Sequence, residues 1–246
     1  MIGVFDSGLG GLTVVREIIK KFPQEDLIYL GDTARVPYGT RSAEIIIKFS
    51  VECALFLQKQ GVSKIIIACN TASAYAFEAV RKSVNIPVSE IINFGARGTF
   101  GGKKIGVIGT RATINSRMYE KKIKEINPDA NVISMATPLL VPLIEEGEIT
   151  GEIVEAALKK SLAGLFDIDT LVLGCTHYPV VSGIINKMFP AVRLVNPGEE
   201  LAKEWVSEGG SGLDKYYFTD LPGRYVEVAE MFLGQKLTGK VERVIL

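Results

Sequence analysis

Two cysteines, Cys69 and Cys175, lie in segments that share one pattern. KIIIACNTAS covers residues 64–73 and TLVLGCTHYP covers residues 170–179, and each is a short apolar run followed by a cysteine and then by polar residues. His177, the single histidine of the chain, lies two residues beyond Cys175. A histidine beside a thiol can lower the pKa of that thiol or act as an acid. The two segments are therefore candidates for a site that transfers protons.

The apolar run before each cysteine is short and rich in β-branched residues. Such runs are typical of strands that are buried on both faces of a parallel sheet. Residues that follow a strand lie at its carboxyl end, where open α/β sheets bind their ligands. We therefore expect both thiols at sheet ends, together with the polar residues that follow them: Asn70, Thr71 and Thr176. If the two ends face each other, two thiols flank one ligand.

Each candidate also has a structural interpretation. A free cysteine is often a small buried hydrophobe, which is the expected role of Cys53 on the apolar face of a predicted helix. Recurrence at equivalent strand ends argues against that role for the other two cysteines. Asp6 and Ser7 end the first predicted strand and could equally form a turn or cap a helix. Tyr38 could be a half-buried aromatic residue of a loop.

Two other kinds of site have weaker support. The glycine-rich turn at residues 8–13 resembles part of a dinucleotide-binding fingerprint, with Asp32 as its acidic residue, but Thr13 replaces the third glycine. Two cysteines and a histidine could hold zinc with an open position. However, Cys175 and His177 belong to one loop and lack the usual ligand spacing. Neither a nucleotide nor a zinc site is favoured.

The composition suits a protein that binds a small polar ligand. The chain has 246 residues, and its 28 basic residues balance its 28 acidic ones. This balance gives no global electrostatic reason to bind nucleic acid or an anionic membrane. No apolar run approaches the roughly 18 residues that cross a bilayer, and the start does not resemble a secretory signal. Three cysteines do not form a disulfide framework, so we expect free thiols and a cytoplasmic location.

Apolar spacing, glycines and prolines predict alternating strands and helices, as a parallel sheet with crossover helices requires. Expected strands cover 2–5, 26–30, 64–68, 87–92, 103–109, 132–135, 170–174, 192–195 and 215–219. Expected helices cover 12–21, 42–60, 74–83, 115–127, 150–166 with Thr150 as its cap, 181–188, a segment from 197, and 222–233. Residues 145–147 are expected to form a turn.

The pattern of the first half recurs in the second. Gly3 and Val4 have counterparts 103 residues later, and Cys69 has its counterpart 106 residues later. Near-constant spacing suggests two similar parallel-sheet α/β domains related by duplication. Residues 209–212 resemble a linker, and the short tail beyond them must pack on one half. We therefore expect a discontinuous first domain of 1–95 plus 209–246, and a second domain of 96–208.

Four segments together resemble a known family. DSGLGGLTV at 6–14, GDTARVPYG at 31–39, ACNTAS at 68–73 and GCTHYP at 174–179 are similar to motifs of the cofactor-independent glutamate racemases of the aspartate/glutamate racemase superfamily. The resemblance runs from the first residues to the segment at 217–219. The chain departs from the family pattern at Asn93-Phe94, where Glu-Pro is frequent, and at Thr137, where cysteine is frequent.

The resemblance implies an active site in a cleft between two domains, with Cys69 on one side and Cys175 on the other. Inverting a stereocentre by proton exchange needs a base on one face and an acid on the opposite face, and two thiols suit a reaction that runs both ways. By the same resemblance Asp6 assists Cys69, while His177 and Glu145 assist Cys175. Glu146 is an alternative to its neighbour Glu145, and the sequence does not choose between them.

The resemblance also implies a set of residues that line the substrate. Fixed hydroxyl and amide donors would meet the negative charge that develops when the weakly acidic α-proton leaves. The implied substrate-binding residues are Asp6, Ser7, Tyr38, Gly39, Asn70, Thr71, Thr176 and His177. Thr113 is a further suitable hydroxyl donor, and we expect it to bind the substrate as well.

The implied activity is interconversion of L- and D-glutamate without pyridoxal phosphate or a metal, which would supply D-glutamate for peptidoglycan synthesis in a bacterial cytoplasm. The implied assembly is a homodimer. One alternative is an aspartate racemase of the same superfamily. Another is a small-ligand-binding α/β protein whose cysteines are structural.

Overall fold

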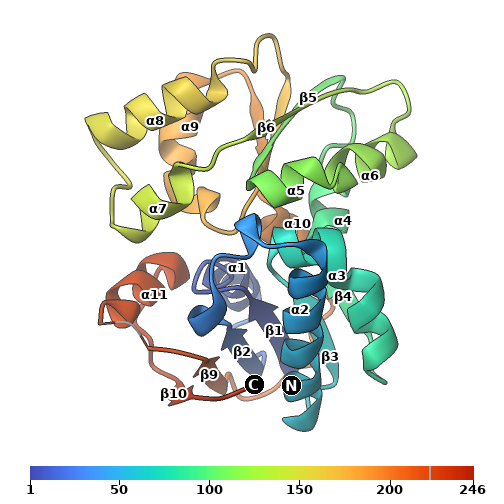
Figure 1. Ribbon diagram of the computed structural model, residues 1–246, viewed down its shortest axis with the longest axis vertical. Coiled ribbons are helices and arrows are strands. Elements are labelled where there is room, and N and C mark those ends of the chain that lie inside the picture. Colours follow the sequence, from blue (N-terminus) through green and yellow to red (C-terminus); the bar gives the residue numbers. More distant parts are fainter. Residues whose placement is uncertain (222) are drawn as a thin grey trace.

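Two parallel sheets form the framework of the molecule (Figure 1). The computed structural model describes residues 1–221 and 223–246. Figure 1 shows the first sheet in the lower half and the second sheet in the upper half, with helices packed around both. Within the described residues every strand pairing is parallel, so the predicted α/β class is confirmed.

The first sheet has the strand order β10-β9-β2-β1-β3-β4 and the second has the order β6-β5-β7-β8. The strands of the first sheet are β1 Ile2–Asp6, β2 Leu27–Gly31, β3 Lys64–Ile67, β4 Val88–Glu90, β9 Asp214–Phe218 and β10 Lys240–Arg243. Those of the second sheet are β5 Lys104–Gly109, β6 Asn131–Ala136, β7 Thr170–Gly174 and β8 Arg193–Val195.

Helices connect successive strands and cover the sheets. They are α1 Leu12–Lys21, α2 Ala43–Lys59, α3 Asn70–Ser83, α4 Ile91–Arg97, α5 Arg111–Asn115, α6 Met118–Ile126, α7 Leu140–Glu145, α8 Glu152–Leu162, α9 Ser182–Met188, α10 Pro197–Glu204 and α11 Tyr225–Leu233. Short 3-10 turns are η1 Thr33–Arg35, η2 Tyr38–Thr40 and η3 Tyr178–Val181. Among the residues described, no helix is long and apolar enough to cross a membrane.

Four strands repeat the same arrangement in both sheets. The order β4-β3-β1-β2 in the first sheet corresponds to β8-β7-β5-β6 in the second. Consequently β3 and β7, which precede the two cysteines, occupy equivalent positions beside the central strands β1 and β5. Every residue of β1 and β7 is buried, as continuous apolar strands covered on both faces require.

The tail joins the first sheet. Strand β9 pairs with β2, so the last fifth of the chain extends the sheet that its first fifth begins. A further strand, β10, pairs with β9 and was not expected from the sequence. The helix predicted at 222–233 begins at Tyr225, and Pro222 lies outside the described residues. The division of the chain at residues 95 and 208 into two domains stays a prediction.

Two predicted helices have different bounds from those expected. Helix α3 begins at Asn70 rather than at residue 74, because the Cys69 sulfur caps it by accepting the Ala72 N–H at 3.4 Å. The helix predicted at 115–127 is two helices, α5 and α6. Arg117 separates them, since its φ of 54° is left-handed and cannot continue a helix.

Three other element predictions were wrong in detail. The strand predicted at 87–92 ends at Glu90, whose carboxylate accepts the N–H groups of Ile92 and Asn93 and starts α4 there. Thr150 does not cap α8, which begins at Glu152 after Gly151 with a φ of 91°. The turn expected at 145–147 begins one residue late, because Glu145 is the last residue of α7.

Candidate active site

A cavity of about 260 Å³ lies where the carboxyl ends of strands from both sheets meet. Ser7 follows β1 and Cys69 follows β3 on the side of the first sheet, while Thr110 follows β5 and Cys175 follows β7 on the side of the second. Of the predicted site residues, those that line the cavity are Ser7, Tyr38, Gly39, Cys69, Asn70, Thr71, Glu145, Cys175, Thr176 and His177. Both thiols therefore line one cavity.

The Cys69 thiol is held on the side of the first sheet. Its sulfur accepts the Ala72 N–H and lies 3.5 Å from the Ser7 hydroxyl. Burial and the negative charge of Asp6 raise the pKa of this thiol to about 12. It is therefore a thiol rather than a thiolate in the resting protein.

Asp6 lies one hydrogen bond behind the cavity wall. Its carboxylate accepts the Gly8 N–H at 3.0 Å and the Thr176 hydroxyl at 3.5 Å, so it connects the two sides of the site. Burial raises the pKa of Asp6, although the nearby charge of His177 and the Gly8 N–H oppose this rise. A carboxyl group that is less acidic than usual is suited to exchange protons with a neighbouring group.

Cys175 has a different partner. Its sulfur lies 3.7 Å from Nδ1 of His177, and Nε2 of the same ring lies 3.0 Å from the Glu145 carboxylate. Burial alone would lower the pKa of His177, but the hydrogen bonds and charges of Cys175 and Glu145 raise it to about 10. Because Nε2–H donates to the carboxylate, a proton on Nδ1 points at the sulfur, and the imidazolium can stabilise a thiolate there.

The structure separates the two glutamates that the sequence could not. Glu145 contacts His177, whereas the carboxylate of Glu146 lies 3.3 Å from Nη1 of Arg224. These different directions follow from the end of α7 at Glu145, after which the chain turns.

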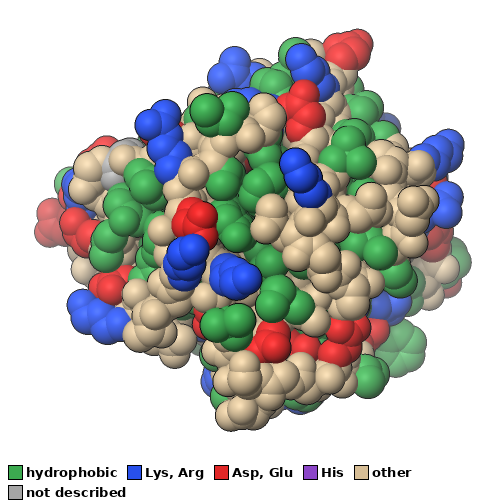
Figure 2. Space-filling model, turned by 90° about the horizontal axis from the view of Figure 1, so that it is seen from below, with side chains coloured by type: hydrophobic (Ala, Val, Ile, Leu, Met, Phe, Trp, Pro, Cys, Tyr) green, Lys and Arg blue, Asp and Glu red, His purple; other side chains and the backbone are tan. Residues whose placement is uncertain are grey.

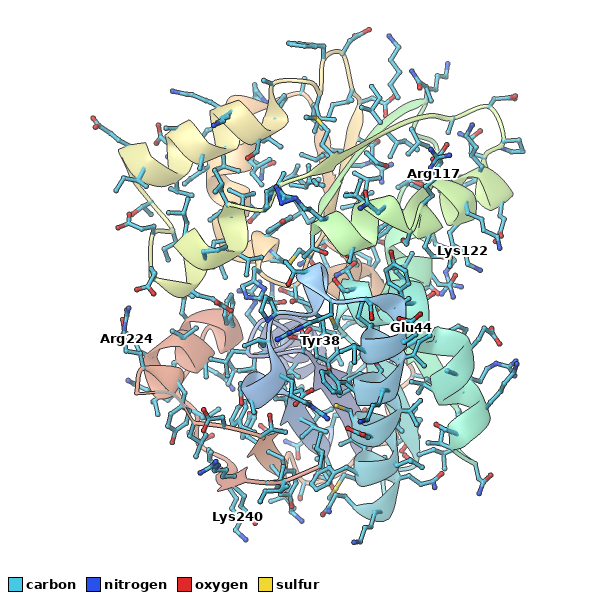
Figure 3. All side chains as sticks on the ribbon, in the orientation of Figure 1. Tyr38, Glu44, Arg117, Lys122, Arg224 and Lys240 are labelled. Atoms are coloured by element: carbon cyan, nitrogen blue, oxygen red, sulfur yellow. The ribbon has the colours of Figure 1, made fainter. Side chains whose placement is uncertain are left out.

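Tyr38 and Gly39 form part of the cavity wall through η2. Figure 3 shows Tyr38 near the middle of the molecule, between the two sheets. Its hydroxyl donates to Asp32 at 2.5 Å, and the same carboxylate pairs with Arg35 and accepts the Thr219 hydroxyl. Asp32 therefore anchors the wall, and its oxygens are occupied by protein groups rather than free for a ribose.

Hydroxyl and amide groups line the wall beside Gly39, which packs against Thr110. Thr71 is within 2.9 Å of the Thr110 hydroxyl and 3.1 Å of the Thr113 hydroxyl, so Thr113 is one hydrogen bond behind the lining. Tyr119 donates to Oδ1 of Asn70 at 2.6 Å, which leaves the Asn70 amide hydrogens to point elsewhere.

Sequence reasoning missed part of the lining. Thr110 and Arg111 enter it because β5 ends there in the same way as the strands before the cysteines. That equivalence was a signal that could have found them, and it also applies to Thr137, which follows β6 and departs from the family pattern, whereas nothing in the sequence marks Pro138 or Val141. The remaining cysteine, Cys53, is buried, and burial raises its pKa, as expected of a structural residue.

Metal ligands are not grouped in the described part of the chain. No set of three or more histidine, cysteine, aspartate or glutamate side chains is arranged there to hold a metal ion.

Comparison with known proteins identifies the family of the chain. The family model for Asp/Glu/hydantoin racemases matches residues 2–205. The chain belongs to the Asp/Glu/hydantoin racemase family. It is therefore an isomerase, and the interpretation as a non-catalytic binding protein was wrong.

Relatives of this racemase extend the match to the whole chain. A glutamate racemase from Geobacter metallireducens is 45% identical, and the alignment covers 100% of this chain and 96% of the relative. The solved structure of glutamate racemase from Francisella tularensis in complex with D-glutamate is 40% identical, with a TM-score of 0.91 and coverage of 99% and 97%. An aspartate racemase from Picrophilus torridus is 18% identical, with a TM-score of 0.57 and coverage of 82% and 90%, and shares the fold alone.

Proposed function

We propose that this racemase interconverts L- and D-glutamate by proton transfer at the α-carbon, with Cys69 and Cys175 as the two bases. The observation that carries the proposal is the pair of thiols that follow equivalent strands of two sheets and line one cavity. Inversion requires a proton to leave on one face and arrive on the other, and two thiols from separate sheets supply both steps. We expect no need for pyridoxal phosphate or a metal.

Glutamate is the proposed substrate because relatives at 40–45% identity over the whole chain carry that activity in their names. Likeness to an aspartate racemase is limited to the fold. Arg111 is one of the residues that line the cavity, and its positive charge can attract a substrate that carries two carboxylates. Turnover on glutamate that exceeds turnover on aspartate at least tenfold would support this choice, and the reverse ratio would contradict it.

On the side of the first sheet, Asp6 is the proposed helper of Cys69. The thiol must lose its proton before it can act as a base, and its raised pKa makes this step costly. When the buried carboxylate of Asp6 is charged, it favours the protonated form of the Cys69 thiol. Transfer of the thiol proton to Asp6 would remove that negative charge and leave the thiolate. Ser7 and the Ala72 N–H would then stabilise the sulfur charge.

On the side of the second sheet, His177 and Glu145 are the proposed helpers of Cys175. The imidazolium would hold Cys175 as a thiolate when it acts as a base and would return a proton when it acts as an acid. Glu145 would keep the ring charged and oriented.

Donors on the cavity wall are proposed to bind the substrate and the carbanion-like transition state. They are the side chains of Ser7, Asn70, Thr71 and Thr176, supported by Thr113 and by the backbone at Tyr38-Gly39. Such fixed donors act strongly in a cavity from which water is excluded.

Loss of deuterium from L- and D-glutamate labelled at Cα tests the proposal. The parent should wash out deuterium and invert both enantiomers without an added cofactor, while Cys69→Ser and Cys175→Ser should each lose inversion by at least about 10³-fold. If either variant inverts glutamate at the parental rate, the two-thiol proposal is wrong.

We further propose a cytoplasmic homodimer that supplies D-glutamate for peptidoglycan synthesis. On the face shown in Figure 2, acidic and basic side chains are interspersed, which agrees with a small-molecule rather than a nucleic-acid partner. Sedimentation equilibrium at micromolar concentration should give twice the 26.7 kDa chain mass, and a mass of one chain would contradict the dimer.

A further inference from the structure

The ring of His177 is enclosed by residues that do not belong to the cysteine segments. Phe232 packs against it with ring centroids 4.8 Å apart and planes at 77°, an edge-to-face arrangement. Gly10 also packs closely against the ring. A Cβ at that position would be only 2.5 Å from the Cε1 and Nδ1 atoms of His177. His177 therefore packs between the turn after β1 and the tail helix α11.

Hydrogen bonds alone do not fix this ring. Nδ1 lies 3.7 Å from the Cys175 sulfur, which is a long contact, and Nε2 lies 3.0 Å from the carboxylate of Glu145, whose side chain is 44% exposed. Rotation of the ring about the bond between Cβ and Cγ would carry both nitrogens away from these partners and misalign both bonds. Packing of a rigid aromatic side chain against the imidazole opposes this rotation.

Phe232 comes from a part of the chain that the family model does not cover. The match ends at residue 205, whereas α11 follows β9 in the tail. Phe232 is fully buried and belongs to the same apolar cluster as Cys175, and α11 packs on α1. Figure 1 shows α11 directly below α7, and Arg224 at the start of α11 reaches Glu146 at the end of α7.

We propose that Phe232 is a positioning residue that holds the His177 ring between Cys175 and Glu145. This inference rests on the proposed role of His177 in the racemase reaction. Phe232 touches the histidine and acts through it, so its loss should slow proton transfer more than it weakens substrate binding. The titratable groups that face the ring are Cys175, Glu145 and Asp6.

The test compares Phe232→Leu with Phe218→Leu in the full-length protein. Phe218 is equally buried in the tail but packs against Tyr29 and Tyr225. We expect Phe232→Leu to lower kcat about tenfold in both directions with KM changed less than about twofold, because misplacement of a catalytic group acts on the chemical step. Phe218→Leu should keep kcat within about twofold, although both variants lose thermal stability.

A second measurement is independent of activity. His177 is the only histidine, so its Cε1–H signal in a proton NMR titration reports one group. Leucine keeps the surroundings apolar, so looser bonds to Glu145 and Cys175 should shift the titration midpoint to lower pH in Phe232→Leu and not in Phe218→Leu. If the parent does not racemise glutamate, the proposed function fails while this titration still decides the role of Phe232.

Equal kcat values and equal titration midpoints for the two variants would overturn the proposal. If Phe232→Leu does not fold, Phe232→Met takes its place, because methionine retains more of the volume but lacks the rigid ring. The same two outcomes then apply.

Discussion

At the scale of residues, the two thiols occupy equivalent positions but have unlike neighbours. Cys69 lies near the carboxyl group of Asp6, whereas Cys175 lies beside the imidazole of His177. A negative neighbour disfavours a thiolate and a positive neighbour favours one. In the proposed mechanism the two proton transfers would depend on different supporting groups, and each side can be tested separately.

Glu145→Gln should slow the reaction, and Glu146→Gln should not. Glutamine at 145 can still accept a hydrogen bond but no longer stabilises the imidazolium by charge, so we expect kcat to fall about tenfold. Glu146 pairs with the exposed Arg224, so its variant should stay within about twofold of the parent. Steady-state racemisation by circular dichroism measures both, and equal losses would contradict the role of Glu145.

Stability should depend on pH through His177. Its pKa is about 10 in the folded protein, whereas an unperturbed histidine has a pKa of 6.5, so the folded state holds this proton more tightly. The stabilisation is complete below about pH 6.5 and is lost as the pH rises to about 10. Urea unfolding at pH 6 and pH 9.5 should show a smaller loss of stability for His177→Gln than for the parent. An identical loss in both proteins would mean that His177 does not contribute.

At the scale of elements, parallel strands and the helices between them were largely predictable. Continuous apolar runs located β3, β5 and β7 to within a residue or so. A strand that is buried on both faces needs apolar residues at nearly every position, so its sequence is easy to recognise. Helix starts were less predictable. The Cys69 sulfur and the Glu90 carboxylate both serve as caps, and neither could be recognised without knowing which side chains are buried beside free N–H groups.

The cap of α4 should give the protein a second pH dependence. Burial raises the pKa of Glu90 to about 7 from its ordinary value of 4.5, so the folded state binds this proton more tightly and stability falls as the pH rises from 4.5 to 7. Glu90→Gln keeps an acceptor oxygen without the charge and should remove this part of the fall.

Glu90→Ala serves as the matched comparison for the cap itself. It loses both acceptor oxygens and should be about 1 kcal/mol less stable than the parent at pH 5. Chemical denaturation at pH 5 and pH 8 measures the three proteins. If the stability of the Gln variant changes with pH as much as that of the parent, Glu90 does not titrate in this range.

At the scale of the whole molecule, the sequence predicted many of the residues that line the cavity between the two sheets, while their roles in the reaction stay a prediction. The cysteine segments and the strand ends located the thiols, the histidine and the polar residues beside them. The tail was less predictable, since neither β10 nor the contact between Phe232 and His177 follows from local spacing. Contacts between segments that are distant in the chain arise from packing, which periodicity does not encode.

Glutamate should stabilise the folded protein because it would contact both sheets at once. A ligand at about 100 times its dissociation constant adds about 2.7 kcal/mol to the free energy of unfolding. We expect a concentration-dependent rise in the melting temperature with L- or D-glutamate and a much smaller rise with aspartate. Differential scanning calorimetry measures this, and equal shifts for the two amino acids would argue against glutamate as the preferred ligand.

The pairing of β2 with β9 affects the order in which the newly made chain can fold. Strand β2 ends at Gly31, but its partner on one side ends at Phe218, so that edge stays open until nearly the whole chain has left the ribosome. The second sheet is contiguous from Lys104 to Val195 and can close earlier. During that interval the apolar residues of β2 form an unpaired edge, which is the kind of surface that chaperones bind and that promotes aggregation of incomplete chains.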